Sequence, residues 1–360
     1  MKRVHNFSAG PAILPLEVLQ KAQAELVDYQ GTGTSIMEKS HRGPEYTKID
    51  AEARERLSRI LGLGDDFEIM FLQGGASTQF FSVPFNFLSK GETADYINTG
   101  TWSKKSIKEA QLFGSVNEAF SSAESNFSKV PASSELKLTP NAKYVHFTSN
   151  NTIFGTQFPS EPETNGVPLV CDASSDFLSR PIDVDKYGMI YSGAQKNLGP
   201  AGVTVVIIRK SFLATANKPS VPTMVNYKTH AEGAMFNTPP TFAVYMVNLV
   251  LEWIESNGGL NAFKLLNEEK SALLYNEIDA DDFYRGTVEE ASRSNMNVCF
   301  RLGTEELEAE FLKEAATHEL VALKGHRSVG GVRASIYNAC PKDSVEALAS
   351  FMREFKAMKG

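Results

Sequence analysis

Cysteine is scarce in this sequence. Only Cys171, Cys299 and Cys340 occur in 360 residues, and they lie far apart. Such scattered cysteines provide neither the even set of a disulfide framework nor the paired spacing of a zinc site, so we expect no bound metal. The fold must therefore rest on a hydrophobic core, and a chain of this length with 42% hydrophobic residues is long enough for two domains.

Two further absences narrow the class of protein. The net charge is −7 and there is no run of lysine and arginine with interleaved aromatics, so we expect no nucleic-acid partner. The most apolar stretch, residues 242–254, is shorter than the ~20 residues that cross a bilayer, and it contains Asn248 and Glu252. Residues 1–7 lack the apolar segment of a secretion signal. We expect a cytoplasmic globular protein without a membrane partner.

The stretch around Lys196 places a reactive side chain in a tight turn. Residues 191–202 read Tyr-Ser-Gly-Ala-Gln-Lys-Asn-Leu-Gly-Pro-Ala-Gly, between an apolar run at 189–191 and a β-branched run at 203–208. This pattern predicts strand, turn and strand. Lysine forms Schiff bases with carbonyl compounds, including pyridoxal phosphate. An exposed loop lysine explains this stretch alone equally well, so the rest of the chain decides.

Predicted strands and helices alternate through the first 258 residues, which favours a mainly parallel sheet with helices on both faces. Residues 121–142 are rich in serine and proline and predict a surface loop. After residue 258 the pattern predicts a smaller α+β domain. We expect a large domain at 16–258, and a small one formed by 1–15 with 259–360. The predicted strands are 68–72, 94–98, 143–147, 168–171, 189–191, 203–208, 297–301, 321–323 and 332–336; the predicted helices include 16–29, 104–113, 260–277, 304–318 and 343–358, with others starting near 44, after 78 and at 237–240.

Small or polar residues follow several predicted strands. Glycines followed by Ala76 and Ser77 at a helix start form an anion-binding cup, although a plain strand-to-helix turn remains the alternative. Trp102 is one of two tryptophans and has the shape to stack on a flat ring, but tryptophans more often serve packing. Asp172 closes an apolar strand and needs a cation there, either a protonated ring nitrogen or Arg180.

Cationic residues gather in two loops. His41 and Arg42 precede a helix that starts near Pro44, and they are either a solvated pair or a contact for carboxylate or phosphate. Residues 324–333 contain His326, two arginines and three glycines, which favours an anion site over a basic hairpin tip. Asn237 and Thr238 precede two prolines, where they are first of all helix caps and second an anion cup.

Taken together, these motifs resemble the phosphoserine aminotransferase family of class V, whose members are fold-type I pyridoxal-phosphate enzymes. The resemblance spans the chain, from Asn-Phe-Ser-Ala-Gly-Pro-Ala at residues 6–12, through residues 73–79 and 193–202, to residues 325–339. It implies a seven-stranded type of sheet, pyridoxal 5′-phosphate as cofactor, and a homodimer with shared active sites.

The resemblance also implies a role for each matching position. Lys196 would hold the cofactor covalently and move protons, and Asp172 would keep the pyridinium nitrogen protonated. Trp102 would stack on the ring, Thr152 and Gln195 would bond its substituents, and Ala76 and Ser77 would hold the phosphate. Asn237 and Thr238 would reach that phosphate from the partner subunit. Arg333 would bind the substrate α-carboxylate, and the distal anion would be received by His41, Arg42, His326 and Arg327.

The family reaction is reversible and of ping-pong type. It converts 3-phosphohydroxypyruvate and L-glutamate to O-phospho-L-serine and 2-oxoglutarate in L-serine biosynthesis. In some bacteria a homologous reaction supplies 4-phosphohydroxy-L-threonine for pyridoxine biosynthesis. One site must accept phosphate and carboxylate in turn, which a cluster of arginines and histidines does and a fitted apolar pocket does not.

Three other functions are weaker interpretations. A cysteine desulfurase needs a reactive cysteine on a mobile loop, whereas Cys171 and Cys299 fall in predicted strands and Cys340 lies beyond the site motif. An alanine–glyoxylate type of aminotransferase does not need the cationic cluster. A phosphate-sensing binding protein would use the cups at 74–78 and 237–238, but it leaves Lys196 and Asp172 unexplained.

Overall fold

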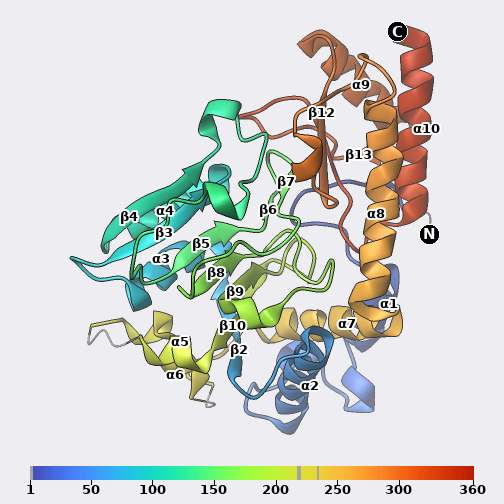
Figure 1. Ribbon diagram of the computed structural model, residues 1–360. Helices are drawn as coiled ribbons and strands as arrows, with labels where there is room; N and C mark the ends of the chain where they lie inside the picture. Colours follow the sequence, from blue (N-terminus) through green and yellow to red (C-terminus); the bar gives the residue numbers. More distant parts are fainter. Residues whose placement is uncertain (1–2, 217–219, 233–234) are drawn as a thin grey trace.

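The centre of the molecule is a seven-stranded sheet (Figure 1). The computed structural model describes residues 3–216, 220–232 and 235–360. β10 runs antiparallel to both of its neighbours, and the other neighbouring pairs are parallel. This arrangement confirms the mainly parallel α/β fold. In spatial order the strands are β2 (Phe67–Gly74), β10 (Gly202–Arg209), β9 (Tyr187–Gly193), β8 (Leu169–Asp172), β5 (Val145–Thr148), β3 (Thr93–Asn98) and β4 (Ser115–Ser121).

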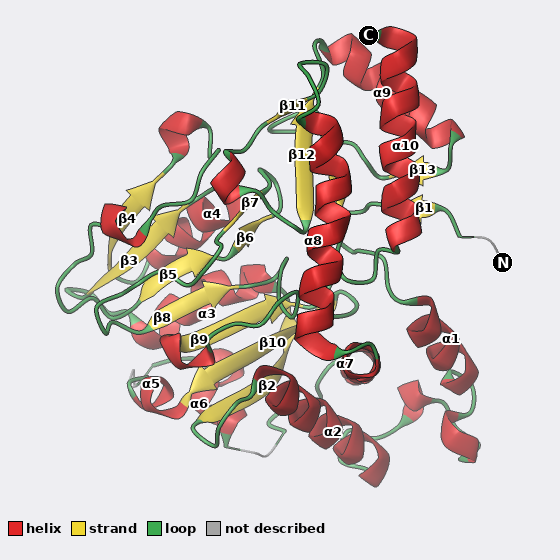
Figure 2. Ribbon diagram, turned by 45° about the vertical axis from the view of Figure 1, so that its right-hand side comes forward, coloured by secondary structure: helices red, strands yellow, loops and turns green. Residues whose placement is uncertain are grey.

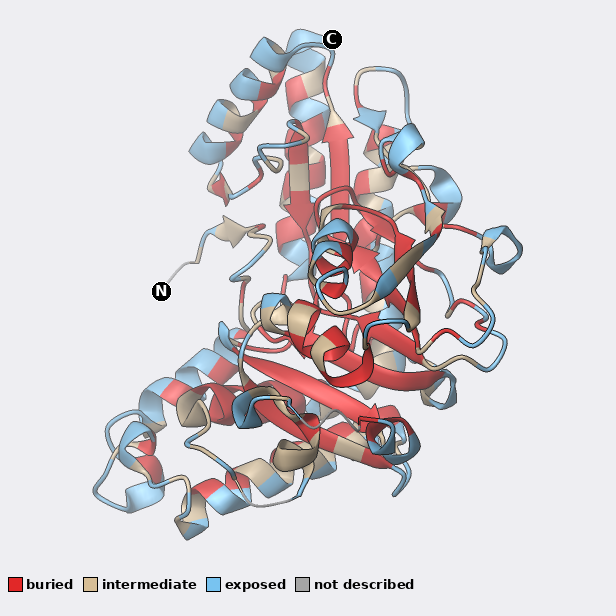
Figure 3. Ribbon diagram, turned by 90° about the vertical axis from the view of Figure 1, so that its left-hand side faces the viewer, coloured by how far each residue is buried: buried red, intermediate tan, exposed pale blue. Residues whose placement is uncertain are grey.

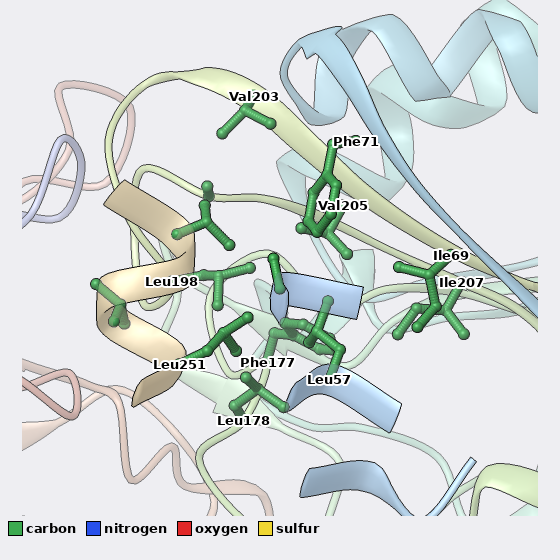
Figure 4. Packing of buried hydrophobic residues seen from close by; sticks show 14 of the residues in the cluster. Leu57, Ile69, Phe71, Phe177, Leu178, Leu198, Val203, Val205, Ile207 and Leu251 are labelled. Carbon is green, nitrogen blue, oxygen red and sulfur yellow. The ribbon is translucent and has the colours of Figure 1, made fainter. Parts of the chain in front are cut away.

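Helices cover both faces of this sheet, because its strands are hydrophobic on both sides. Val205 and Ile207 of β10 pack on one face, where Figure 4 shows them with Leu57, and Val206 and Ile208 pack on the other. The first face is covered by α1 (Leu16–Glu25), α2 (Pro44–Leu61) and α7 (Thr241–Ser256). The second is covered by α3 (Ala76–Phe87), α4 (Thr101–Ala110), α5 (Lys210–Ala214) and α6 (Tyr227–Ala231).

A second hydrophobic core lies around the C-terminal helices and joins the two ends of the chain (Figure 2). Phe7 and Ile13 pack in it with residues from 274 to 355. We propose on this basis the division into residues 16–258, and 1–15 with 259–360, although Phe263 still packs in the first core. The elements here are α8 (Gly259–Ile278), β11 (Arg285–Gly286), β12 (Asn297–Arg301), α9 (Glu305–Thr317), β14 (Val332–Ser335) and α10 (Lys342–Lys359), with β1 (His5–Asn6) paired to β13 (Leu320–Val321).

The first helix is shorter than predicted. α1 ends at Glu25 instead of residue 29, and Leu19 and Leu26 of its predicted buried face are exposed. The Asp28 carboxylate accepts a hydrogen bond from the Gly33 backbone N–H at 2.7 Å, which closes a turn where the periodicity predicts helix. The local side-chain bond therefore overrides the hydrophobic pattern.

An edge strand was not predicted at all. β4 occupies residues 115–121, between the predicted helix at 104–113 and the predicted loop at 121–142, and it pairs with β3 across a register shift. Its polar Asn117 and Glu118 hide the strand pattern, yet Asn117 Nδ2 donates to Asp95 Oδ1 of β3 at 3.0 Å. α4 likewise starts at Thr101 instead of residue 104.

The remaining short elements are β6 (Asn150–Asn151), β7 (Thr156–Gln157) and 3-10 turns at Tyr29–Gly31, Ile36–Glu38, Ala123–Ser125, Ser133–Glu135, Val184–Lys186, Thr223–Val225 and Glu290–Ser292.

Burial follows the layered architecture. Figure 3 shows the central strands buried and the outward sides of the helices exposed. All three cysteines are buried and free. Within the described ranges, no helix combines the length and the apolar character that crossing a membrane requires.

Candidate active site

Lys196 lies in the turn between β9 and β10, at the carboxyl end of the sheet's parallel strands. The Ala194 carbonyl accepts hydrogen bonds from the N–H groups of Leu198 and Gly199, which closes a tight turn around the lysine. Lys196 Nζ donates to Thr152 Oγ1 at 2.7 Å. The same nitrogen lies 5.1 Å from the centroid of the Trp102 ring. The turn thus holds the amine in one place between a hydroxyl group and an aromatic ring.

The N-terminal segment fixes this turn from the other side. The Ala12 N–H donates to the Gln195 carbonyl at 2.8 Å. Gly10 has a φ of 146°, and a Cβ at this position would lie 3.3 Å from Lys196 Cγ. A larger residue would therefore press on the lysine stem, which explains the glycine in the motif at residues 6–12.

The amine of Lys196 is easier to deprotonate than that of an ordinary lysine. Burial, together with the positive charge of Arg333, lowers the pKa of Lys196 to about 8, and the charge of Asp172 opposes this shift. A pKa near 8 leaves a substantial neutral fraction at physiological pH, and the neutral amine is the nucleophilic form.

Asp172 ends β8 as a buried carboxylate. Ser174 satisfies only Oδ1, through its N–H at 3.0 Å and its hydroxyl at 2.6 Å. Burial raises the pKa of Asp172, and the Lys196 charge opposes the increase. Arg180 is not its partner, because this guanidinium donates to the Phe158 carbonyl at 3.1 Å and acts on Asp176 instead. Arg180 is therefore not the cation that compensates Asp172; the cation that acts on this carboxylate among the described residues is Lys196.

The glycine-rich turn after β2 leaves the start of α3 open. Gly75 is the N-cap, and no side chain caps the first turn that contains Ala76 and Ser77. A Cβ at Gly193, in the strand leading to Lys196, would lie 3.1 Å from the Ala76 backbone nitrogen. Gly193 N–H also donates to Ser174 Oγ at 3.0 Å. The uncapped N–H groups therefore lie next to both the lysine turn and the Asp172 strand, where they favour an anion.

Thr152 and Arg333 connect β14 to the lysine turn, and Trp102 lies beside the same lysine. Trp102 lies in the first turn of α4, and its indole Nε1 is buried without a partner among the described residues. Arg333 of β14 donates from Nη1 to the Thr152 carbonyl at 3.4 Å, while the Thr152 hydroxyl accepts from Lys196. Arg333, on a strand of the C-terminal part, thus contributes its charge to Lys196.

The hairpin that carries His326 and Arg327 reaches the same region. The Gly325 N–H donates to the Gly331 carbonyl at 2.9 Å, and Val329 packs with Trp102 on a small apolar cluster at Phe127. Burial lowers the pKa of His326, as do the charges of Arg333, Arg327 and Lys105. The charges of these three residues therefore reach the His326 ring.

Of four further predicted residues, two have no contact with the lysine turn among the described residues, and two lie beside the open turn before α3. His41 and Arg42 belong to the segment between α1 and α2, at the opposite end of the molecule from β12 and β13 in both ribbon views. No recorded contact joins them to Lys196, although His41 Nε2 is buried without a partner within the described chain. Asn237 and Thr238 lie beside the strand before the open turn, since Gln73 Nε2 donates to the Thr238 carbonyl at 2.7 Å. They do not cap α7, because its N-cap is Pro240 and no side chain bonds there.

Sequence reasoning missed a set of residues that support the lysine turn. The Asn338 N–H donates to Asn197 Oδ1 at 2.9 Å, and Asn338 Nδ2 donates to the Leu178 carbonyl at 2.8 Å. Lys270, a fully buried residue of α8, donates to the carbonyls of Ile336, Tyr337 and Cys340 at 2.9, 2.8 and 3.2 Å. A lysine in an amphipathic helix pattern predicts an exposed side chain, so the sequence carried no signal for Lys270.

The assembled residues fit pyridoxal phosphate. They provide an amine with a lowered pKa, a buried carboxylate whose second oxygen has no recorded hydrogen bond among the described residues, an aromatic ring and an uncapped helix start. These are the groups that bind a carbonyl, a pyridinium nitrogen, a flat ring and a phosphate. The described chain holds no cluster of histidine, cysteine, aspartate and glutamate suited to a metal ion.

Comparison with known proteins gives a consistent result. The family model described as aminotransferase class-V matches residues 4–348. The phosphoserine aminotransferase of Niallia circulans is 54% identical over 361 residues, covering 100% of this chain and 99% of the relative. That of Desulfosudis oleivorans is 53% identical over 362 residues, with 100% and 99% covered.

Solved structures agree with these sequence relatives. The phosphoserine aminotransferase from Bacillus circulans subsp. alkalophilus superposes with a TM-score of 0.98 at 52% identity, covering 100% of both chains. The pyridoxal-phosphate-bound phosphoserine aminotransferase from Trichomonas vaginalis gives a TM-score of 0.93 at 41% identity, with 98% of this chain and 100% of that chain covered. A Thermus thermophilus aspartate aminotransferase at 19% identity, with 98% and 99% of the two chains covered, shares the fold with a TM-score of 0.79.

Proposed function

Because the chain belongs to the class-V aminotransferases, and among them to the phosphoserine aminotransferases, we propose that it converts 3-phosphohydroxypyruvate and L-glutamate to O-phospho-L-serine and 2-oxoglutarate. It is a pyridoxal-phosphate-dependent aminotransferase of serine biosynthesis. The observation that carries the specific reaction is the combination of the Lys196 amine with the cations Arg333 and Arg327, which form no ion pair within the described residues.

The cofactor is attached to Lys196 in this proposal. Bound pyridoxal phosphate supplies an electron sink for the electrons left on the amino acid's α-carbon when its proton is removed. Lys196 Nζ then removes and returns this proton, a role that requires the neutral amine. Asp172 holds the proton on the ring nitrogen, since its buried charge is stabilised by that proton.

The surrounding residues orient the cofactor. Ala76 and Ser77 bind its phosphate with the free N–H groups of α3, and Trp102 packs on its ring. Thr152 and Gln195 hydrogen-bond the ring substituents. The support for these assignments is the convergence of the strand ends on Lys196.

Two groups of cations bind the substrate. Arg333 pairs bidentately with the α-carboxylate common to both amino acids, which its position beside Thr152 supports. His326 and Arg327, with His41 and Arg42, receive the distal group, which is a phosphate in one half-reaction and a carboxylate in the other. The same site accepts 4-phosphohydroxy-L-threonine, which carries the same α-amino acid and phosphate groups and would place the chain in pyridoxine biosynthesis as well.

The site is completed by a second copy of the chain. We propose a homodimer in which His41, Arg42, Asn237 and Thr238 of one chain serve the other chain's site. The distance of the segment between α1 and α2 from the rest of the site supports this arrangement, as do its exposed apolar side chains Val27 and Met37. We place the reaction in the cytoplasm, where free cysteines stay reduced.

The visible absorption spectrum tests this function. The purified protein, loaded with pyridoxal phosphate, is titrated separately with L-glutamate, O-phospho-L-serine and L-alanine. We expect the yellow form to be bleached by the first two amino acids and not by alanine, because alanine lacks a distal anion. Bleaching by alanine alone would keep the fold and overturn the substrate. A protein that stays colourless with added cofactor would contradict the reaction and favour a binding protein.

A further inference from the structure

Lys105 is a cation beside the active site to which no role has yet been assigned. It lies one turn after Trp102 on α4 and is exposed. Its Nζ is 4.7 Å from the centroid of the Trp102 ring, and the Nζ of Lys196 is 5.1 Å from the same centroid. The ammonium groups of Lys105 and Lys196 therefore both lie near the Trp102 ring, and Lys196 belongs to the lysine turn.

Within the residues that the structure describes, no acidic group forms an ion pair with this lysine. Glu109 is the acidic residue of α4, and neither it nor any other carboxylate in the described part of the chain forms a recorded ion pair with Lys105, Arg327 or Arg333. The charge of Lys105 instead reaches the hairpin of His326, whose pKa is lowered by burial and then by the charges of Arg333, Arg327 and Lys105. Several cations that repel one another at close range make a site that an anion stabilises.

We propose that Lys105 is a further residue of the distal-anion site and that it favours phosphate over carboxylate. This inference rests on the proposed function. A lysine acts as a point charge on a flexible stem, so its attraction scales with the charge of the ligand and does not depend on a planar fork. A phosphate monoester carries about −1.5 to −2 charges near neutral pH, whereas the glutamate side chain carries one. Lys105 therefore strengthens binding of phosphoserine more than binding of glutamate.

The test compares Lys105→Met with Lys108→Met. Methionine keeps most of the stem and removes the charge, and Lys108 is an exposed lysine of the same helix for which no contact to the site is recorded. For Lys105→Met we expect KM for O-phospho-L-serine to rise about 5- to 20-fold and KM for L-glutamate about 2- to 5-fold, with kcat unchanged. Lys108→Met should match the wild type. The difference should shrink as ionic strength rises.

A binding measurement separates this inference from the proposed function. Inorganic phosphate is titrated into each protein while tryptophan fluorescence is followed, since Trp102 lies beside Lys105. We expect weaker phosphate binding in Lys105→Met by the same factor as the KM for phosphoserine. Equal KM changes for both amino acids, or unchanged phosphate binding, would overturn the role of Lys105. If the wild type does not turn over phosphoserine, the proposed function fails, and the phosphate titration still decides on Lys105.

Discussion

At the scale of single residues, burial around the lysine turn sets the pKa values of Lys196 and Asp172. Lys196 is an ordinary amino acid whose amine becomes reactive because the surrounding chain removes water and adds the Arg333 charge nearby. Asp172 partly offsets this change, which keeps the pKa of Lys196 near 8 instead of lower. The pair thus tunes the amine to the pH at which the enzyme is expected to work.

Uptake of the cofactor should depend on pH through Lys196. Below its pKa of about 8 the neutral fraction of the amine grows about tenfold per pH unit, and above that value it is constant. We therefore expect the rate at which cofactor-free protein binds pyridoxal phosphate to rise up to about pH 8 and then level off. Stopped-flow absorbance measures this rate. Replacing Asp172 by Asn should move the levelling point to lower pH, because its charge raises the pKa of Lys196; a rise that continues to pH 10 contradicts the lowered pKa.

Lys270 shows what the sequence pattern misses at the same scale. The residue lies in a predicted helix, and lysine in such a pattern normally indicates the solvent-facing side. In the structure it is buried and binds three carbonyls after β14, and burial lowers its pKa to about 8. The position of Asp172 at the end of an apolar strand was therefore predictable from the sequence, whereas the buried hydrogen bonds of Lys270 were not.

Replacement of Lys270 by Met should destabilise the fold by about 3–5 kcal/mol, because three buried carbonyls lose their donor. Urea denaturation at neutral pH measures this loss. The control is Lys264→Met on the same helix, whose exposed pair with Glu268 contributes no more than about 0.5 kcal/mol.

The stability of the wild type should also depend on pH through Lys270. The folded pKa of Lys270 is lowered, so the unfolded state binds more protons between about pH 8 and 10.5, and the stability of the wild type relative to Lys270→Met should rise across that window. Equal stability of Lys270→Met and Lys264→Met would contradict the structural role of Lys270.

At the scale of elements, the ends of strands and helix starts bring the site together. β8, β9 and the turn before α3 deliver Asp172, the lysine turn and the open N–H groups to one edge of the sheet. The alternation of strands and helices predicted this edge, because ligands of open α/β sheets bind at the carboxyl ends of the strands. The position of β10, antiparallel between β2 and β9, was not predictable, since strand order depends on contacts between residues that are far apart in the sequence.

The turn after β14 should control the geometry of the lysine turn. Asn338 bonds to Asn197, the neighbour of Lys196, and its side chain bonds to the Leu178 carbonyl. The Asn197→Ala variant removes the acceptor of the buried Asn338 N–H, so we expect kcat to fall about 10- to 100-fold with little change in KM for glutamate. A shift of the cofactor absorption maximum or of its pH dependence should accompany the loss. A variant with reduced thermal stability but an unchanged spectrum and kcat would show that the contact is only structural.

At the scale of the whole molecule, the site depends on two cores and, in our proposal, on two chains. Arg333 lies on β14 between Val332 and Ala334 of the second core, and it donates to the Thr152 carbonyl beside Lys196, so the two parts must stay in register for activity. The loop with His41 and Arg42 was predicted from its cations, but within one chain it lies at the opposite end of the molecule from β13, the strand before the His326 hairpin. Their role as anion contacts stays a prediction, and the sequence could not say from which copy they would act, because a motif contains no information on symmetry.

Mixed dimers test the shared site. Lys196→Ala and the double variant Asn237→Ala, Thr238→Ala are each expected to be nearly inactive alone. If each site takes its lysine from one chain and residues 237–238 from the other, half of the randomly mixed dimers regain one intact site, and about a quarter of wild-type activity returns. Activity no higher than that of the separate variants after subunit exchange would place both groups in one chain.

The most direct measurement is the stoichiometry of a single half-reaction. The protein loaded with pyridoxal phosphate is mixed with excess O-phospho-L-serine in the absence of any keto acid, and the 3-phosphohydroxypyruvate released is quantified. We expect one equivalent per chain, in step with loss of the yellow colour, and none from Lys196→Ala. Release of no keto acid by the wild type, or an equal yield from Lys196→Ala, would contradict the assignment of Lys196 as the catalytic amine of a phosphoserine transaminase.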